Sequence, residues 1–229
     1  IAIGNNAGKT LQSTDSIAIG VSAGLLNQSS LAIAIGSNAG TTSQKTLATA
    51  IGPDAGKTIQ GTNSTAIGFS AGKTSQGDNS LAIGTTAGSD TQGTSSTAIG
   101  ANAGATKQGN ASIAIGPNAG KTSQKPQATA IGFGAGELSQ CSGALAIGAS
   151  AGYTGQGVTP VAIGPSAGLT RQQAEAVALG FQAGKWSQGT RGVAIGYDAG
   201  QANQGSSALA IGFQDGYNIQ GPGATAIGW

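Results

Sequence analysis

A sixteen-residue repeat runs through the whole chain without insertion or deletion. In the unit "TAIGFSAGKTSQGDNS" (65–80), position two is always alanine, positions four and eight glycine, and position twelve glutamine. Column numbers below give the position within this unit. The regularity predicts a single repeat array over 1–229 rather than one or two globular domains. Because the chain starts in phase and has no methionine, we expect it to be a segment of a longer array. The units start at residues 1, 17, 33, 49, 65, 81, 97, 113, 129, 145, 161, 177, 193 and 209, with a partial unit at 225–229.

The composition favours strands over helices. Glycine accounts for 42 of the 229 residues, and each glycine inside a helix costs about 1 kcal/mol relative to alanine. Repeats built of paired helices also need about thirty or more residues. A unit that begins with a β-branched residue, Ala, Ile and Gly, followed by turn residues, predicts one coil of a parallel β-solenoid. We therefore expect an all-β β-roll of fourteen 16-residue coils, on the order of 65–70 Å long at about 4.8 Å per coil.

The first strand of each unit is expected to be covered on both faces. Side chains alternate across a strand, so columns one and three share one face and column two the other. Column two never varies, which predicts that its alanines fill a narrow interior. The side chains of columns one and three then form an outer apolar stripe on the order of 700 Å² or more, which is larger than a soluble monomer usually exposes.

A parallel trimer with column three on its axis would bury this stripe. The alternative is a monomer that turns the isoleucines inward and leaves the alanine column unexplained. The predicted axis residues are Ile3, Ile19, Ile35, Ile51, Ile67, Ile83, Ile99, Ile115, Ile131, Ile147, Ile163, Leu179, Ile195, Ile211 and Ile227.

The glutamine column predicts a structural role. Stacked in register, the side-chain amides can bond along the array as a ladder, or cap turn carbonyls inside the coil. A catalytic role is excluded because glutamine neither titrates nor attacks. The column consists of Gln12, Gln28, Gln44, Gln60, Gln76, Gln92, Gln108, Gln124, Gln140, Gln156, Gln172, Gln188, Gln204 and Gln220.

The segments "NSTAIGFSAG" (63–72) and "ASIAIGPNAG" (111–120) resemble the head repeats of trimeric autotransporter adhesins. Similar "AIG…AG" arrays occur in tail-fibre-like proteins of phages and large DNA viruses. The resemblance covers all fourteen units and rests on the in-phase AIG triplet. It implies a left-handed parallel β-roll in a trimer, with the Ile3 column at the axis and the Ala2 column inside each roll. It also implies an extracellular location, on a cell surface or a virion surface.

One segment looks like a phosphate-binding loop, but its spacing is wrong. In Gly52–Thr58 only three residues separate Gly52 from Gly56, whereas the P-loop needs four. A P-loop also occurs once per nucleotide domain, and this near-miss recurs at Gly4–Thr10, Gly68–Thr74 and Gly116–Thr122. We interpret it as part of the repeat.

Other chemistry is expected to be absent. The chain has no histidine, and its eight carboxylates are dispersed, so we expect no catalytic, metal or cofactor site and no enzyme. A net charge of +2 and only 8% charged residues argue against nucleic acid as a partner. No apolar window is long enough to predict membrane insertion.

Three features have two interpretations each. Asp215 breaks the alanine column, either as an ion ligand or as a tolerated polar residue. The lone Cys141 is either a reactive thiol or a neutral change at a turn. The aromatic residues of column five form either a receptor or glycan patch or the packing of a coil corner. These are Phe69, Phe133, Phe181, Tyr197 and Phe213.

Our first hypothesis is a structural or adhesive fibre segment: a rigid trimeric spacer of a surface adhesin or a viral tail-fibre-like protein. The expected partners are further copies of the chain and a surface receptor or glycan. The alternative is an ice-binding β-solenoid, since threonine recurs in column ten, although other residues interrupt it. A β-helical polysaccharide lyase is a weaker hypothesis because acids and bases do not cluster. The threonines are Thr10, Thr42, Thr58, Thr74, Thr106, Thr122, Thr154 and Thr170.

Overall fold

The computed structural model describes residues 1–228. They form two compact units, Ile1–Ser112 (unit 1) and a second that starts at Ile113 (unit 2). Each unit is a parallel β-solenoid, and the described residues contain no helix. The prediction of an all-β parallel β-solenoid is therefore confirmed.

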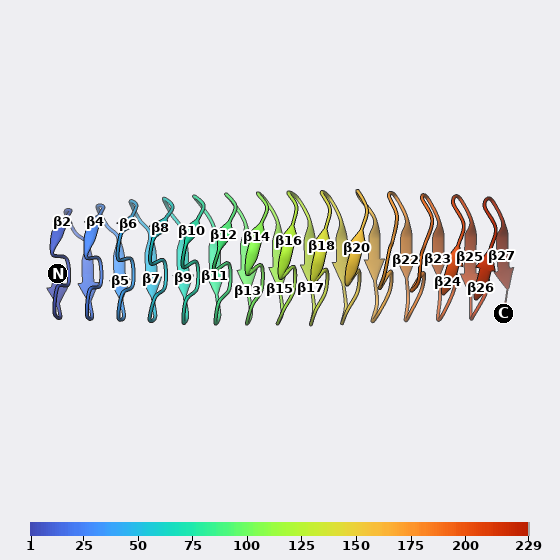
Figure 1. Cartoon of the computed structure of the whole chain (residues 1–229), viewed down its shortest axis with the longest axis horizontal. Coiled ribbons are helices and arrows are strands. Elements are labelled where there is room, and N and C mark those ends of the chain that lie inside the picture. The colour runs from blue at the N-terminus through green and yellow to red at the C-terminus, as the bar shows by residue number, and fades with distance from the viewer. Residues whose placement is uncertain (229) are drawn as a thin grey trace. The chain divides into compact units, whose positions relative to one another are not determined.

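Unit 1 contains two parallel sheets whose strands alternate along the chain (Figure 1). The first sheet comprises β1 (Ala2–Ile3), β3 (Ile17–Ile19), β5 (Ile33–Ile35), β7 (Thr49–Ile51), β9 (Thr65–Ile67), β11 (Leu81–Ile83) and β13 (Thr97–Ile99). The second comprises β2 (Thr10–Gln12), β4 (Leu26–Gln28), β6 (Ser43–Gln44), β8 (Ile59–Gln60), β10 (Ser75–Gln76), β12 (Thr91–Gln92) and β14 (Thr106–Gln108).

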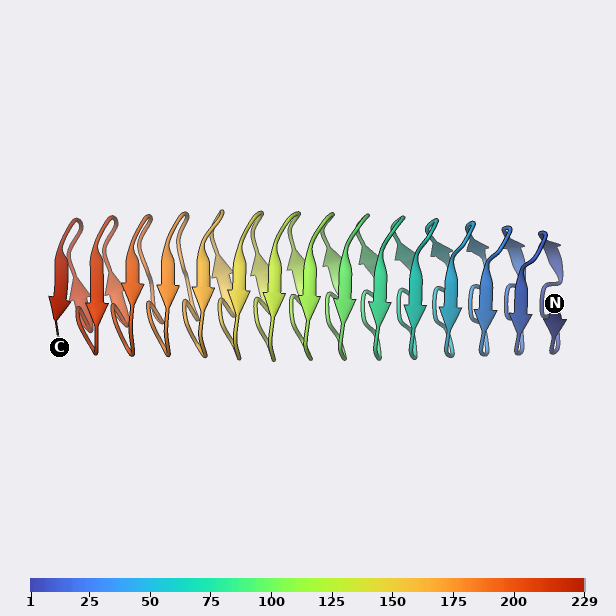
Figure 2. The ribbon, with the colours of Figure 1, turned by 180° about the vertical axis from the view of Figure 1, so that it is seen from behind.

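Unit 2 repeats this plan, and Figure 2 shows its first-sheet strands side by side. They are β15 (Ile113–Ile115), β17 (Thr129–Ile131), β19 (Leu145–Ile147), β21 (Val161–Ile163), β22 (Val177–Leu179), β23 (Val193–Ile195), β25 (Leu209–Gly212) and β27 (Thr225–Gly228). The second sheet has β16 (Thr122–Gln124), β18 (Leu138–Gln140), β20 (Thr154–Gln156), β24 (Ala202–Gln204) and β26 (Asn218–Gln220). Between β20 and β24 it narrows to single bridges at Thr170 and Trp186.

Each strand of the first sheet pairs with the equivalent strand of the next sixteen-residue coil, so equivalent residues lie opposite each other. Ala18 lies opposite Ala34, and Ile19 opposite Ile35; in unit 2, Ala130 lies opposite Ala146. Equal side chains therefore stack in columns within each unit. Because every coil repeats its neighbour, one favourable contact is repeated at each step, which explains why some columns never vary.

The interior of each coil is filled by small side chains. Column-two alanines from Ala18 to Ala210 and column-seven alanines from Ala23 to Ala199 are fully buried. The predicted interior position of column two is confirmed. The structure adds column sixteen, which is also buried from Ser16 to Ala208 and holds only Ser, Ala, Pro or Gly. Its restriction to small residues was a signal in the sequence that our interpretation missed.

The two invariant glycine columns are required by close approach. At Gly68, φ is +125°, and a Cβ would lie 2.8 Å from the carbonyl oxygen of Gly84 in the next coil. At Gly72, φ is +52°, and a Cβ would lie 2.8 Å from Oε1 of Gln76. Column four thus lets neighbouring backbones meet, and column eight leaves room for the glutamine amide.

Candidate functional site

The isoleucine column lies on the outer face of the first sheet in each unit. Ile67 and Leu179 are 36% and 41% exposed, whereas Ala66, which precedes Ile67 in β9, is fully buried. The inward-facing isoleucines that the monomeric alternative assumed are wrong, because alanine and glutamine side chains occupy the interior. We call this outer surface, columns one and three of the first sheet, the isoleucine face. Its role as a trimer axis stays a prediction.

The glutamine side chains lie inside the coils and join the two sheets. Nε2 of Gln44 donates to the carbonyl of Ile33 at 2.6 Å, at the start of β5, and to that of Ala48 at 3.1 Å, in the turn before β7. In each described coil, Nε2 of the glutamine donates to the column-one carbonyl eleven residues earlier. Buried carbonyls need partners, and these amides supply them.

A ladder between glutamines forms in parts of the array. In unit 1, Gln28 donates to Oε1 of Gln44, and Gln44 to Gln60, both at 3.1 Å. In unit 2 the run from Gln156 to Gln220 is continuous. Elsewhere Oε1 is buried without a partner, as at Gln76 and Gln92. The main-chain cap is thus the general function of the column, and the ladder is a local addition.

Replacing Gln60 with leucine is expected to destabilise the fold without changing its shape. The change removes the donor to the carbonyl of Thr49, at 2.6 Å, and the acceptor for Gln44. A buried polar group left without a partner costs about 1–3 kcal/mol, so a loss in this range or above is expected in denaturant unfolding. The matched control is Ser75→Leu, in the second sheet but outside the coil interior. Equal stability of the two variants would contradict a structural role for the amide.

The column-five aromatics of unit 2 stack on one another at a coil corner. The ring centroids of Phe181 and Tyr197 are 4.9 Å apart, and those of Tyr197 and Phe213 are 5.3 Å apart, with nearly parallel planes. The rings remain 38–54% exposed. Stacking covers ring faces and leaves mainly ring edges for a ligand. The structure therefore supports packing at a coil corner, and a receptor or glycan patch at these rings stays a proposal.

A polar cluster beside this stack was not predicted. Nε2 of Gln201 donates to Oε1 of Gln182 at 2.9 Å and to Oδ1 of Asp198 at 2.8 Å. Asp198 is only 7% exposed. These residues belong to columns six and nine, which vary between coils, so no invariant position pointed to them.

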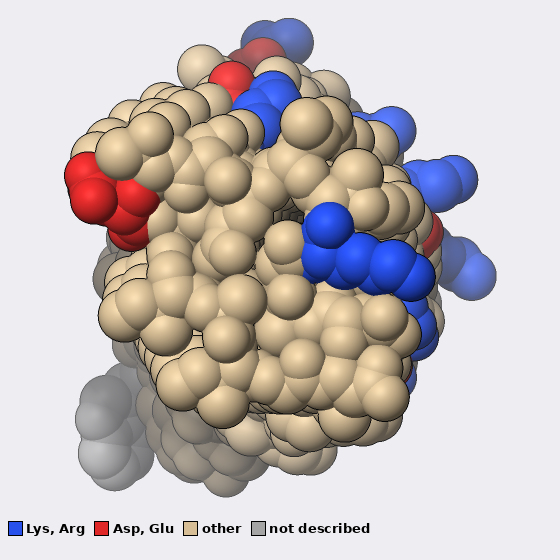
Figure 3. Space-filling model, turned by 90° about the vertical axis from the view of Figure 1, so that its left-hand side faces the viewer, with Lys and Arg blue, Asp and Glu red and all other residues tan. Residues whose placement is uncertain are grey.

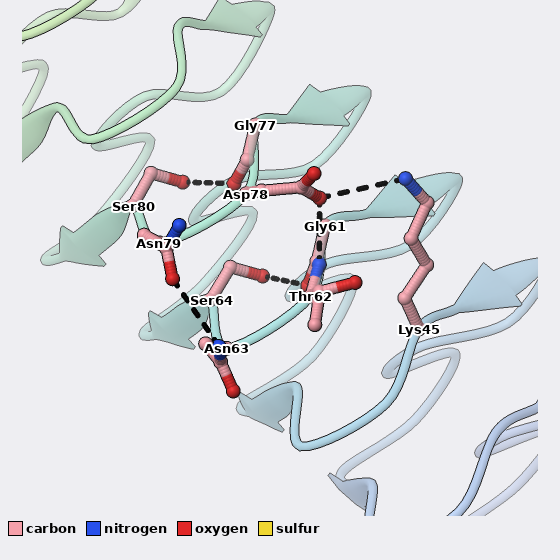
Figure 4. A network of polar contacts seen from close by, with 9 residues as sticks. All are labelled: Lys45, Gly61, Thr62, Asn63, Ser64, Gly77, Asp78, Asn79 and Ser80. Atoms are coloured by element: carbon pink, nitrogen blue, oxygen red, sulfur yellow. Dashed lines mark hydrogen bonds and ion pairs between the residues drawn. The ribbon is translucent and has the colours of Figure 1, made fainter.

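Figure 4 shows a polar network at the turns before β9 and β11 of unit 1. Oδ1 of Asp78 accepts from the N–H of Thr62 at 2.8 Å and pairs with Nζ of Lys45 at 3.4 Å. The Thr62 hydrogen bond, with the charge and hydrogen bond of Lys45, lowers the pKa of Asp78. Asn63 also donates to Asn79. The network fixes surface turns and is exposed, so each contact contributes little stability.

The segment that looks like a P-loop has no free phosphate cradle. The N–H groups of Gly56 and Thr58 donate to the carbonyls of Ala71 and Lys73 in the next coil. Nζ of Lys57 pairs with Oδ1 of Asp54 at 3.0 Å. Burial opposes ionisation of Asp54, but Lys57 and Asn38 outweigh it and lower its pKa. The groups that would bind a phosphate are thus used by the fold.

Neither Asp215 nor Cys141 belongs to a group of metal-ligating side chains within residues 1–228. Oδ2 of Asp215 is buried without a partner, and no three potential metal-ligating side chains gather in the described residues. Cys141 is half-buried at a turn.

In the view of Figure 3 the surface is mostly uncharged, with basic side chains scattered along one side. No helix in 1–228 is long and apolar enough to cross a membrane.

Comparison with known proteins identifies the repeat type. Residues 60–87 and 92–119 match the model of the YadA head domain repeat, in two copies. This match confirms the resemblance to adhesin head repeats for these two segments of the β-solenoid. Repeats of this type are structural rather than enzymatic. No curated protein sequence matches the chain.

Proposed function

We propose that the chain is a structural and adhesive fibre segment that works as a parallel homotrimer. The observation that carries the proposal is the pair of columns in the first sheet. The alanine column is fully buried, whereas the isoleucine column beside it lies outside the coil and stays partly exposed in a single chain, as at Ile67 with 36%. Burying apolar surface contributes about 25 cal/mol per Å², so a stripe on every coil strongly favours association.

The matched family supports this assembly and a surface location. YadA-type head domains are trimeric and surface-exposed. We extend both properties to this chain, with its single array over 1–229 as a rigid spacer on a cell or virion surface. In a viral tail-fibre-like protein the same spacer would present a distal domain.

A receptor contact at the aromatic corner is a further part of the proposal. Phe181, Tyr197 and Phe213 form an exposed aromatic stack in unit 2, and Gln182 and Gln201 next to it are joined by a hydrogen bond. Because the rings stack face to face, a protein receptor fits better than a glycan, which binds aromatic faces.

The ice-binding alternative receives less support. Thr42 and Thr58 of column ten are half-buried, whereas Thr74 is exposed, so the hydroxyls are unevenly presented to solvent. In unit 2 the column is interrupted by Leu138 and Trp186, which are themselves exposed. An even row of exposed hydroxyls, which would organise water, is therefore not formed.

Thermal unfolding at several protein concentrations tests the homotrimer. Because association stabilises only the folded state, the Tm of a trimer rises with concentration. We expect one sharp transition whose midpoint increases over a hundredfold dilution series (about 1 to 100 μM, a range suited to tight assemblies). A reversible transition with a constant midpoint would contradict the proposal.

A further inference from the structure

Columns five and fifteen border the isoleucine face on its two sides. In each coil, column fifteen lies in the turn before the first-sheet strand, and column five in the turn after it. In unit 1 both borders carry exposed aliphatic side chains. Leu31 and Leu47 of column fifteen are 50% and 51% exposed, and Val21 of column five is 55% exposed.

The two leucines adopt a backbone conformation that suits other residues. Leu31 and Leu47 have φ of 60° and 59°, a left-handed conformation that disfavours leucine and is tolerated best by Gly, Asn and Asp. Asn63 and Asn79 fill the same column in later coils with φ of 55° and 54°. In a single chain, each leucine thus has an unfavourable conformation and leaves about half of its surface exposed, so a further apolar contact would stabilise it.

A second copy of the chain can supply that contact. In a closed ring of parallel copies, each interface joins two different sides of the molecule. With the isoleucine face on the axis, the column-fifteen side of one copy therefore meets the column-five side of the next. The two sides match in unit 1, because both are apolar at neighbouring coils.

We infer that in the proposed trimer Leu31 and Leu47 of one copy pack against Val21 of the next. The inference rests on the proposed trimer and extends it to residues outside the axis. The surface area that a stable interface needs also supports the inference. An isoleucine stripe on the order of 700 Å², divided between two neighbours, falls below the roughly 800 Å² per partner of a standard interface. The flanking columns supply part of the difference.

Replacing both leucines with asparagine tests the inference. If columns five and fifteen are free in solution, the change should stabilise the chain or leave it unchanged, whereas if they form an interface, it should weaken association. Leu31→Asn with Leu47→Asn suits the left-handed turn, so a chain with free borders should be equally or more stable. If the leucines are interface residues, trimer association should weaken about tenfold or more. Sedimentation velocity over a dilution series measures this directly.

Leu11→Asn is the matched control. Leu11 is also an exposed leucine, at 71%, with φ of 55°, but it lies in β2 of the second sheet. Asn27 occupies the same column in the next coil with φ of 56°. We expect this variant to associate as the unchanged chain does.

Disulfide trapping gives a second readout. In a Cys141→Ser background, Val21→Cys with Leu31→Cys places the thiols at opposite ends of β3 and β5. Three extended residues span about 10 Å, beyond the roughly 7 Å Cα separation that a disulfide bridges. Oxidation should therefore yield covalent trimers, and Leu11→Cys with Leu31→Cys should not.

The outcomes separate the two proposals. The border contact alone is overturned if the unchanged chain is a trimer, its asparagine variant associates equally well or better, and its cysteine pair gives no covalent trimer. A monomeric unchanged chain overturns both the trimer and the contact.

Discussion

Replacing Ile67 and Ile83 together with aspartate is expected to leave the chain monomeric but still folded. Both side chains point outward from the first sheet, in β9 and β11, so a single solenoid accommodates the carboxylates in water. On a shared axis, six carboxylates would meet in adjacent layers. Burying an unpaired charge costs several kcal/mol per ion, which exceeds what two layers of isoleucine contribute. Light scattering should give the monomer mass of 21.8 kDa, with the β-sheet circular dichroism spectrum retained.

The same charges on the other sheet are the control. Ser75→Asp with Thr91→Asp adds two carboxylates in β10 and β12 of nearby coils, away from the isoleucine face. This variant should keep the oligomeric state of the unchanged chain. If both double variants behave alike, the isoleucine face is not the association surface.

Replacing Ala66 with leucine is expected to damage the coil itself. Ala66 is fully buried and stacks between Ala50 and Ala82. It also lies beside Gly72, where even an added Cβ would be 3.3 Å from that of Ala66. Overpacking a well-filled interior costs about 1–3 kcal/mol, and more where the surroundings cannot move. Denaturant unfolding should show this loss in both monomers and oligomers.

The neighbouring Ile67→Leu provides the comparison, since Leu179 occupies the same column in unit 2. That variant changes shape on the outer face and should shift stability by less than about 1.5 kcal/mol. A silent Ala66→Leu would show that column two is not a packed interior, which would contradict the facing of the whole first sheet.

The facing of Ala66 and Ile67 could be predicted because strand geometry alternates side chains and the repeat shows which side tolerates change. For Gln60 the sequence predicted a structural role, but it did not distinguish a ladder between glutamines from a cap on main-chain carbonyls. Its cap on Thr49 lies within one coil, whereas the ladder contact between glutamines forms in some coils and not in others. Because glutamine is invariant in this column, the sequence does not distinguish these coils.

The turn columns were the least predictable. Column fifteen holds Leu31, Asn63 and Arg191, all with positive φ, so residue type alone does not report the conformation. The coil geometry imposes it on whatever residue is present. The stacking of Phe181 and Tyr197 likewise follows from the register, because equal columns place rings about one coil apart, and it became clear only when the coils were paired.

The absolute mass of the unmodified chain in solution tests the central claim most directly. Size-exclusion chromatography with light scattering at micromolar concentration should give about three times the monomer mass of 21.8 kDa. The species should persist on dilution, because the isoleucine column lies on the outer face of each described coil and cannot be released one coil at a time. A monodisperse species of 21.8 kDa would contradict a shared isoleucine axis.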